Sequence, residues 1–173
     1  ELDTSAEAIS FSSASDTDTI INTIEEFVKD YNDLVQTLRD TYTTQPAKNS
    51  SGSRYEPLTD DDKADMSESA IASYEEKAKQ GLLFGDSDLS ALYSKLTSAI
   101  SPSGTDGVTL RSIGISTSYS NGTTTLSLDK DALKAALESN PDKVRDVFTK
   151  SKDNGASSDG LMASLKTVAE RYA

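Results

Sequence analysis

The sequence predicts an α+β protein that is mostly helical, with long heptad-like helices and one small antiparallel β-hairpin. Three observations lead to this fold class. Apolar residues recur at steps of three and four in several segments, as they do on one face of a helix. An Asn-Gly pair separates two short β-prone runs, which is typical of a hairpin. Only 35% of the 173 residues are hydrophobic, so we expect a small core.

The N-terminal part predicts a short strand followed by one long helix. Residues 1–15 are rich in Ser and Ala, and Ile9 and Phe11 lie two apart, as on one side of a strand. From there on, the spacing predicts one continuous helix over residues 20–42. Its apolar stripe, expected to be largely buried, consists of Ile20, Ile24, Phe27, Tyr31, Leu34 and Leu38, with Ile21, Val28 and Val35 immediately beside it.

This stripe has two compatible interpretations. Most amphipathic helices pack within their own domain, which would make the stripe part of the core. Alternatively, its partner helix lies outside this chain, because a chain that is 35% hydrophobic offers little apolar surface to cover it. A second stripe of the same kind runs to the last residues of the chain and consists of Leu161, Leu165, Val168 and Tyr172.

The middle of the chain predicts a loop followed by two further helical stretches. Residues 43–58 have the composition of a loop. Thr59 and the three aspartates after it suit a helix N-cap with an acidic first turn, and Gly81 suits the end of that helical stretch. A compact apolar tether at 82–85 then leads to a helix capped by Asp86 or Ser87, whose stripe is Leu89, Leu92, Tyr93, Leu96 and Ile100.

The last third predicts a hairpin near residues 113–128 and three short helices. Asn121-Gly122 suits a two-residue hairpin turn because both residues tolerate positive φ. Asp129 begins the next helix, and Asn140-Pro141 ends it and opens another, because proline suits a first helical position. The first strand is expected to alternate through Ile113, Ile115, Thr117 and Tyr119.

The charge of the chain argues against two classes of partner. Lys and Arg number 17 and Asp and Glu 29, which gives a net charge of −12. An acidic chain repels phosphate backbones and anionic lipids, so we expect no nucleic-acid binding. The same repulsion opposes self-association, and we expect the chain by itself to be monomeric or weakly associating. We also expect no membrane insertion, because no apolar run approaches the roughly 20 residues that span a bilayer.

The residue inventory excludes most catalytic chemistry. The chain has no His and no Cys, which removes the usual nucleophile–base pairs and the most common transition-metal ligands. We therefore expect no cofactor, no metal and no enzyme activity, with a carboxylate-based enzyme as a remote alternative. The acidic cluster Asp60, Asp61, Asp62 and Asp65 lacks calcium-loop spacing and is interpreted as a solvated helix N-terminus. We interpret the start at Glu1 as that of a mature product or an excised piece, and we expect no secretory signal peptide, because no basic start followed by an apolar run is visible.

Several fragments of the chain resemble the flagellar hook-associated protein 2 family, the filament cap proteins. They are the run FVKDYNDL from Phe27 to Leu34, YEPLT at 55–59 and EEKAKQGLL at 75–83. Further fragments follow in the same order at 110–115, at 122–129, at Asn140-Pro141 with Val144 and Phe148, and at Gly160-Leu161. The resemblance covers residues 16–173.

The resemblance implies a structural role in assembly. Such proteins are exported through the flagellar channel and form a ring at the filament tip, where they retain flagellin and promote its polymerisation. The implied partners are further copies of the chain, expected to form a pentamer, together with flagellin and the hook–filament junction proteins. Residues 16–173 would form the helical leg-like domain, and residues 1–15 would return from a head domain that the chain does not include. An adhesin of the flagellum tip is the alternative function.

Overall fold

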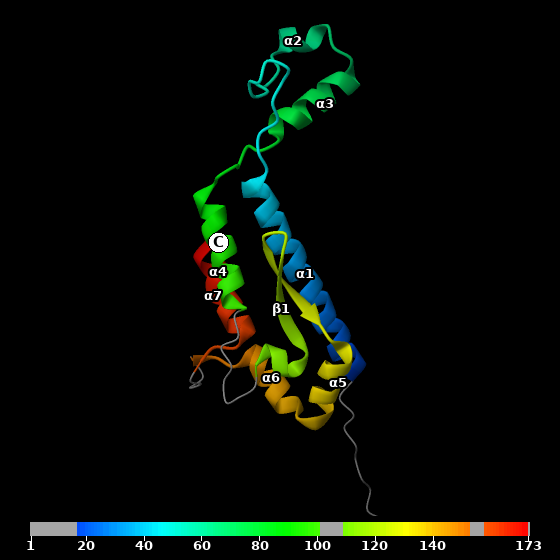
Figure 1. The fold of residues 1–173 in the computed structure, drawn as a ribbon, viewed down its shortest axis with the longest axis vertical. Helices are drawn as coiled ribbons and strands as arrows, with labels where there is room; N and C mark the ends of the chain where they lie inside the picture. The colour runs from blue at the N-terminus through cyan, green and yellow to red at the C-terminus, as the bar shows by residue number, and fades with distance from the viewer. Residues whose placement is uncertain (1–16, 101–108, 153–157, 173) are drawn as a thin grey trace, which may run out of the picture.

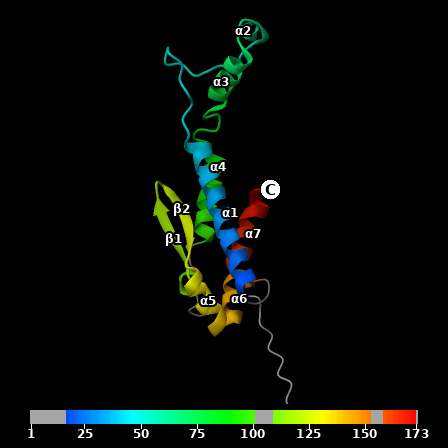
Figure 2. The same cartoon turned by 90° about the vertical axis from the view of Figure 1, so that its right-hand side faces the viewer.

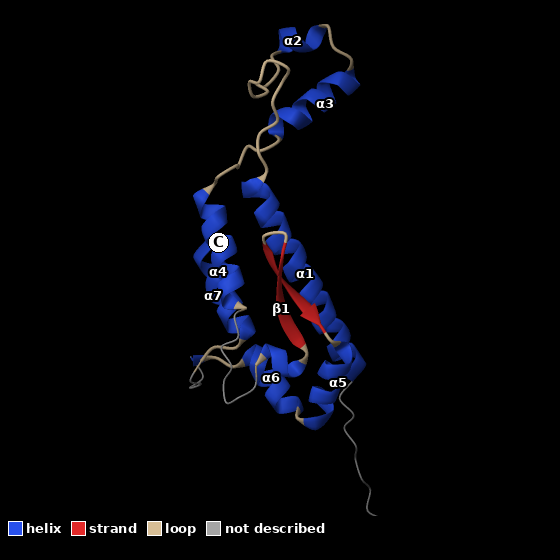
Figure 3. Ribbon diagram, in the orientation of Figure 1, coloured by secondary structure: helices blue, strands red, loops and turns tan. Residues whose placement is uncertain are grey.

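The computed structural model describes residues 17–100, 109–152 and 158–172. Helices dominate it, and a single two-stranded antiparallel sheet completes the described part of the chain (Figures 1 and 3). The predicted mostly helical α+β class is therefore confirmed. The strand expected in residues 1–15 lies outside the described residues. The elements are α1 (Thr17–Thr43), α2 (Asp60–Ala64), α3 (Glu68–Lys79), α4 (Ser87–Ala99), the 3-10 helix η1 (Leu110–Ile113), β1 (Ile115–Ser120), β2 (Thr123–Leu128), α5 (Lys130–Ser139), α6 (Pro141–Thr149) and α7 (Leu161–Tyr172).

Helix α1 is the central helix of the described structure. It is continuous over 27 residues, as predicted, and packs against β2, α4 and α5 (Figure 2). Helix α7 packs against α4 and α6. Steps of three and four bring the buried side chains of α1 onto one line, which consists of Ile21, Ile24, Val28, Tyr31 and Val35. This line and the residues packed against it form the main core of the described chain.

The prediction that all six stripe residues of α1 are buried is wrong at Leu34, whose side chain is 46% exposed. Its neighbour Val35 is fully buried instead. Consecutive helical residues point about 100° apart, so a core line through Val35 places Leu34 on the flank of the helix. Three other members of the predicted stripe are only half-buried at the sides of the line, namely Ile20, Phe27 and Leu38.

The hairpin forms where the Asn-Gly turn predicted it. Strands β1 and β2 pair antiparallel from Ile115↔Leu128 to Ser120↔Thr123. The turn residues Asn121 and Gly122 have φ of 50° and 80°, the left-handed values that a two-residue turn of this kind requires. The sheet lies along α1, with β2 next to the helix and β1 on the outer side (Figure 2).

The first strand begins two residues later than the predicted alternation. Ile113 belongs to η1, whose start is closed by reciprocal hydrogen bonds between Thr109 and Ser112. Gly114 then turns the chain with a φ of 86°, so the strand begins at Ile115. A Cβ on Gly114 would lie 2.6 Å from the carbonyl oxygen of Asp129, and the Asp129 amide donates to the Gly114 carbonyl at 2.8 Å.

Replacing Gly114 by alanine is expected to destabilise the fold by more than the roughly 1–2 kcal/mol of a left-handed backbone alone. The added methyl group also meets the Asp129 carbonyl, which must move. Gly52→Ala is the matched control, because Gly52 has a φ of 83° but no atom within 4 Å of the added Cβ. Urea denaturation of both variants measures the difference, and equal costs would contradict the close packing at Gly114.

Helices α2 and α3 form a small unit at one end of the molecule, joined to the body by two extended connections (Figure 1). Thr59 caps α2, as the sequence predicted, and the structure also shows reciprocal hydrogen bonds between Thr59 and Asp62. These bonds hold the pKa of the Asp62 carboxyl below its usual value. No residue of either helix is buried. The unit is held instead by surface contacts: Tyr55 meets Tyr74 edge-on at 4.8 Å between ring centroids, and Lys63 pairs with Glu75 at 2.7 Å.

The apolar tether predicted at 82–85 is a series of tight turns with exposed side chains. The Phe84 amide donates to the Gly81 carbonyl, and the Gly85 amide donates to the Tyr42 carbonyl at 2.8 Å at the end of α1. Leu82 is 74% exposed and Leu83 48%. The tether thus ties the end of α1 to the start of α4, which Asp86 caps as predicted.

Candidate functional site

An open apolar groove lies between the first half of α1, helices α5 and α6, and the start of α7. It has a volume of about 470 Å³. We call it the apolar groove. Most of its lining side chains are hydrophobic, and those that form its walls and floor are Ile20, Phe27, Leu137, Val144, Phe148 and Met162.

Local sequence signals place the α6 wall of the groove. Asn140 caps α6 through a hydrogen bond from the Lys143 amide to its side chain, and Pro141 occupies the first turn. The helix therefore begins at a defined residue, and Val144 and Phe148, one turn apart, both face the groove.

A close approach of two chain segments sets the position of α7. The Gly160 amide donates to the Lys150 carbonyl at 2.6 Å. A Cβ on Gly160 would lie 2.9 Å from the carbonyl oxygen of Phe148. Because Gly160 has no side chain, α7 starts directly against the end of α6. This places Met162, 39% exposed, at the edge of the groove.

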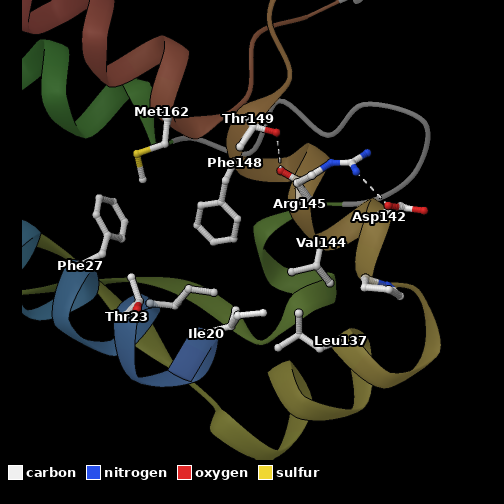
Figure 4. A pocket seen from close by; sticks show the side chains of 12 residues that line it. Ile20, Thr23, Phe27, Leu137, Asp142, Val144, Arg145, Phe148, Thr149 and Met162 are labelled. Carbon is white, nitrogen blue, oxygen red and sulfur yellow. Dashed lines mark hydrogen bonds and ion pairs between the residues drawn. The ribbon is translucent and has the colours of Figure 1, made fainter. Parts of the chain in front are cut away.

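The groove is apolar within and charged at its rim. In Figure 4 the rings of Phe27 and Phe148 lie on opposite sides with Met162 above them. Arg145 pairs with Asp146 at 3.0 Å and with Asp142 at 2.9 Å, on the side away from the rings. The hydrogen bond to Asp146 and the charges of both carboxylates raise the pKa of the Arg145 guanidinium. Arg145 and Asp142 are the charged residues of the groove lining.

The structure places the predicted packing stripes partly in the core and partly at this groove. Ile24, Tyr31 and Leu161 are buried, whereas Leu34 and Tyr172 are exposed. The half-buried members of the two stripes are Ile20, Phe27, Leu38, Leu165 and Val168. Of the ten residues, three of the first stripe line the groove, namely Ile20, Ile24 and Phe27. The second stripe contributes no lining residue, and its helix reaches the groove through Met162.

The arrangement suits packing rather than covalent chemistry. An apolar groove with helical walls can receive the apolar face of a helix or a row of large hydrophobic side chains. Among the described residues, no group of three or more Asp and Glu side chains is placed to hold a metal ion. No described helix is long and apolar enough to cross a membrane.

Sequence reasoning missed the polar contacts that hold the hairpin against the helices. The Asn32 side chain donates to the Leu126 carbonyl at 2.9 Å and accepts from the Leu126 amide at 2.7 Å. In the same way the Tyr93 hydroxyl donates to the Gly122 carbonyl at 3.3 Å and accepts from the Thr124 amide at 3.0 Å. These partners lie far apart in the sequence, and no local pattern indicates them.

Tyr31, the residue before Asn32, is part of the apolar stripe and also forms a polar contact between helices. Its hydroxyl donates to the Leu96 carbonyl of α4 at 3.4 Å. Burial raises the pKa of this hydroxyl far above its ordinary value. Tyr31 therefore joins α1 to α4, and Asn32 joins α1 to the hairpin, so two adjacent residues of one predicted motif tie three elements together.

Comparison with known proteins finds one family that matches nearly the whole chain. Residues 2–173 match the family model described as flagellar hook-associated protein 2 C-terminus. The flagellar hook-associated protein 2 of Halalkalibacterium halodurans is 34% identical over 140 residues, which is 78% of this chain. The aligned region is 25% of that protein, so the chain spans about a quarter of the length of the curated relative it matches. No solved structure matches the chain.

Proposed function

Because the chain belongs to the flagellar hook-associated protein 2 family, we propose that it forms the helical leg-like part of the cap of the flagellar filament. In this role it retains flagellin at the extracellular tip and promotes flagellin polymerisation. It works as a homo-oligomeric ring, and its further partners are flagellin and the hook–filament junction proteins. The role is structural and requires no cofactor.

The observation that carries the proposal is the apolar groove. Phe27, Phe148 and Met162 present large apolar side chains around an open volume of about 470 Å³. A groove with hydrophobic walls between helices can receive the apolar face of a partner helix. We propose that an amphipathic helix of the assembled cap packs into this groove, against Phe27, Phe148 and Met162.

The mechanism follows from what a cap has to do. It must shelter an incoming subunit and then release it, which requires modest, reversible contacts. The chain carries 46 charged side chains, 29 of them acidic, so most of its exposed helix faces are hydrophilic and bind water well. Strong contact is thus concentrated at the apolar groove, and the remaining faces allow a subunit to slide past.

Complementation of a strain that lacks its cap protein tests this role. Met162→Asp places a carboxylate at the partly exposed edge of the groove, where it leaves the core intact but penalises a docked apolar helix. We expect short filaments, flagellin lost to the medium and greatly reduced motility. Leu83→Asp is the matched control, because Leu83 is similarly exposed, at 48% against 39% for Met162, but lies in the tether.

The controls decide between the outcomes. Circular dichroism of both purified variants must show the wild-type helix content. Normal filament growth with Met162→Asp would contradict a role of the groove in the cap. Normal growth combined with loss of attachment to surfaces would favour the adhesin instead.

A further inference from the structure

The small unit that contains α2 and α3 meets the rest of the molecule at a narrow waist. Figure 1 shows the two connections crossing there, the one that follows α1 and the one that leads to α4. Within the described residues, neither α2 nor α3 packs extensively against a helix or strand of the body, and neither contains a buried residue. The waist, and not a packed interface, therefore sets the position of the unit.

The two connections touch at Gly81. A Cβ on Gly81 would overlap the main-chain nitrogen of Pro46 and would lie 2.6 Å from the carbonyl carbon of Gln45. The Gln80 side chain donates to the Gln45 carbonyl at 3.3 Å. So close an approach requires a residue without a side chain, and it brings both connections to one crossing point.

On the body side of the waist, the end of α1 and the start of α4 are held together. The Gly85 amide donates to the Tyr42 carbonyl at 2.8 Å, and the rings of Tyr42 and Tyr93 lie 6.0 Å apart between their centroids. Asp86 caps α4 by accepting from the Leu89 amide at 2.9 Å. Helices α1 and α4 also pack along each other. The two connections thus leave the body from one fixed base.

On the other side of the waist, side chains join α2, α3 and the segment before them into one piece. The Tyr55 ring meets Tyr74 of α3 edge-on at 4.8 Å between centroids, and the Lys77 ammonium lies 5.7 Å from the centroid of the Tyr55 ring. Lys63 of α2 pairs with Glu75 of α3 at 2.7 Å. These contacts connect parts of the unit with one another and not with the body, so the unit can move without breaking them.

We propose that the α2–α3 unit swings as a rigid body about this waist, with the crossing of Gly81 and Pro46 as the pivot. In a hinge, a few residues absorb the change in φ and ψ while the elements on both sides keep their form. Gly81 and Gly85 have φ of 71° and 77°, and glycine adopts both signs of φ with little steric cost. They bracket residues 82–84, whose side chains are exposed, so a swing takes no apolar side chain out of the core.

The swing changes the width of an open hollow of about 590 Å³ at the waist. This hollow is lined by Asp40 and Thr41 of α1, which belong to the body, and by Lys79 of α3 and Leu82, which belong to the unit and its second connection. Because its walls lie on both sides of the hinge, the hollow widens or narrows as the unit moves, while the core of the body is unchanged.

The hinge is independent of the apolar groove. The α1 residues that line the groove run from Ile20 to Phe27, whereas the waist follows the last residue of α1, Thr43. At 1.5 Å per residue, the part of α1 between Phe27 and Thr43 is about 24 Å long. A failure of the proposed helix contact in the groove would therefore leave the hinge in place, and a failure of the hinge would leave that contact in place.

Distances between pairs of spin labels test the swing, because the 173-residue chain has no cysteine and labels can be placed at chosen sites. Thr37→Cys on α1 combined with Ser73→Cys on α3 spans the waist. Thr37→Cys combined with Ser94→Cys on α4 is the matched control, because both sites lie in the body. All three side chains are exposed. Pulsed electron paramagnetic resonance is expected to give a distance distribution at least about twice as broad for the first pair as for the control pair.

Two glycine changes show whether the crossing is the pivot. Gly81→Ala adds a methyl group against Pro46 and forces the two connections apart, so the distance distribution across the waist is expected to shift. Gly52→Ala is the control, because Gly52 lies in the unit with a φ of 83° and has no atom within 4 Å of the added Cβ. It is expected to leave the distribution unchanged. A distribution across the waist as narrow as the one within the body would overturn the hinge, and an unchanged distribution in Gly81→Ala would overturn the pivot at the crossing.

Discussion

Replacing Leu133 by alanine is expected to lower the free energy of unfolding by about 2–5 kcal/mol, the range for leucines in well-packed cores. Leu133 is fully buried in α5. This helix packs against α1, α6 and η1, and the main-chain nitrogen of Leu133 lies 3.0 Å from the position of a Cβ on Gly114. Because α1, α6 and η1 hold the surrounding side chains in place, these side chains cannot relax into the cavity that alanine would leave. We therefore expect a loss of unfolding free energy in the upper half of this range. Urea denaturation measures the change.

Leu34→Ala is the matched control, because it deletes the same atoms at a site that is 46% exposed. We expect it to cost less than about 1 kcal/mol, since much of this side chain is hydrated in the folded state. The predicted stripe had placed Leu34 in the core. A large cost at Leu34 and a small one at Leu133 would contradict the packing described above.

Replacing Asn32 by alanine is expected to cost about 1–3 kcal/mol and to loosen the hairpin from α1. The change removes both bonds of the Asn32 side chain to Leu126, at 2.9 and 2.7 Å. Leu126 is 3% exposed, so its main-chain groups have little access to water as a replacement partner. Hydrogen exchange at the Leu126 amide, followed by NMR, is expected to accelerate in the variant.

The control for Asn32 lies next to it on the same helix. Asp33 forms an exposed ion pair with Lys29 at 2.8 Å, and exposed pairs of this kind contribute little to stability. Asp33→Ala is therefore expected to leave both the unfolding midpoint and the Leu126 exchange rate nearly unchanged. An unchanged exchange rate in Asn32→Ala would show that the hairpin is held by other contacts.

Local signals predicted most of the elements. The caps at Asp86, Asp129 and Asn140 act on amides two or three residues away, so a short stretch of sequence contains both partners. The Asn121-Gly122 turn is equally local. The start of β1 escaped prediction because the apolar alternation continues into Ile113, although the glycine that follows it turns the chain.

Contacts between distant segments could not be predicted. Whether Leu34 or Val35 faces the core depends on how α1 is rotated against β2 and α4, and the apolar spacing allows either. The apolar groove depends on Gly160 letting α7 start against the end of α6. Asn32 bonds to a residue 94 positions away. The family resemblance includes the run that contains Asn32, but only the structure shows which contacts its side chain makes.

The most direct test of the proposed helix contact is the accessibility of residue 162 in assembled flagella. Met162→Cys introduces a thiol at the edge of the groove, 39% exposed, and Leu83→Cys introduces one in the tether, 48% exposed. Maleimide labelling, read by mass spectrometry, compares the purified 173-residue chain with flagella from cells whose own protein carries the same change. We predict that residue 162 is labelled at least about tenfold more slowly in flagella than in the purified chain, because a docked helix would cover this site most of the time. The labelling rate of residue 83 is expected to be the same in both. Equal labelling of residue 162 in both states would contradict the docking of a helix in the apolar groove.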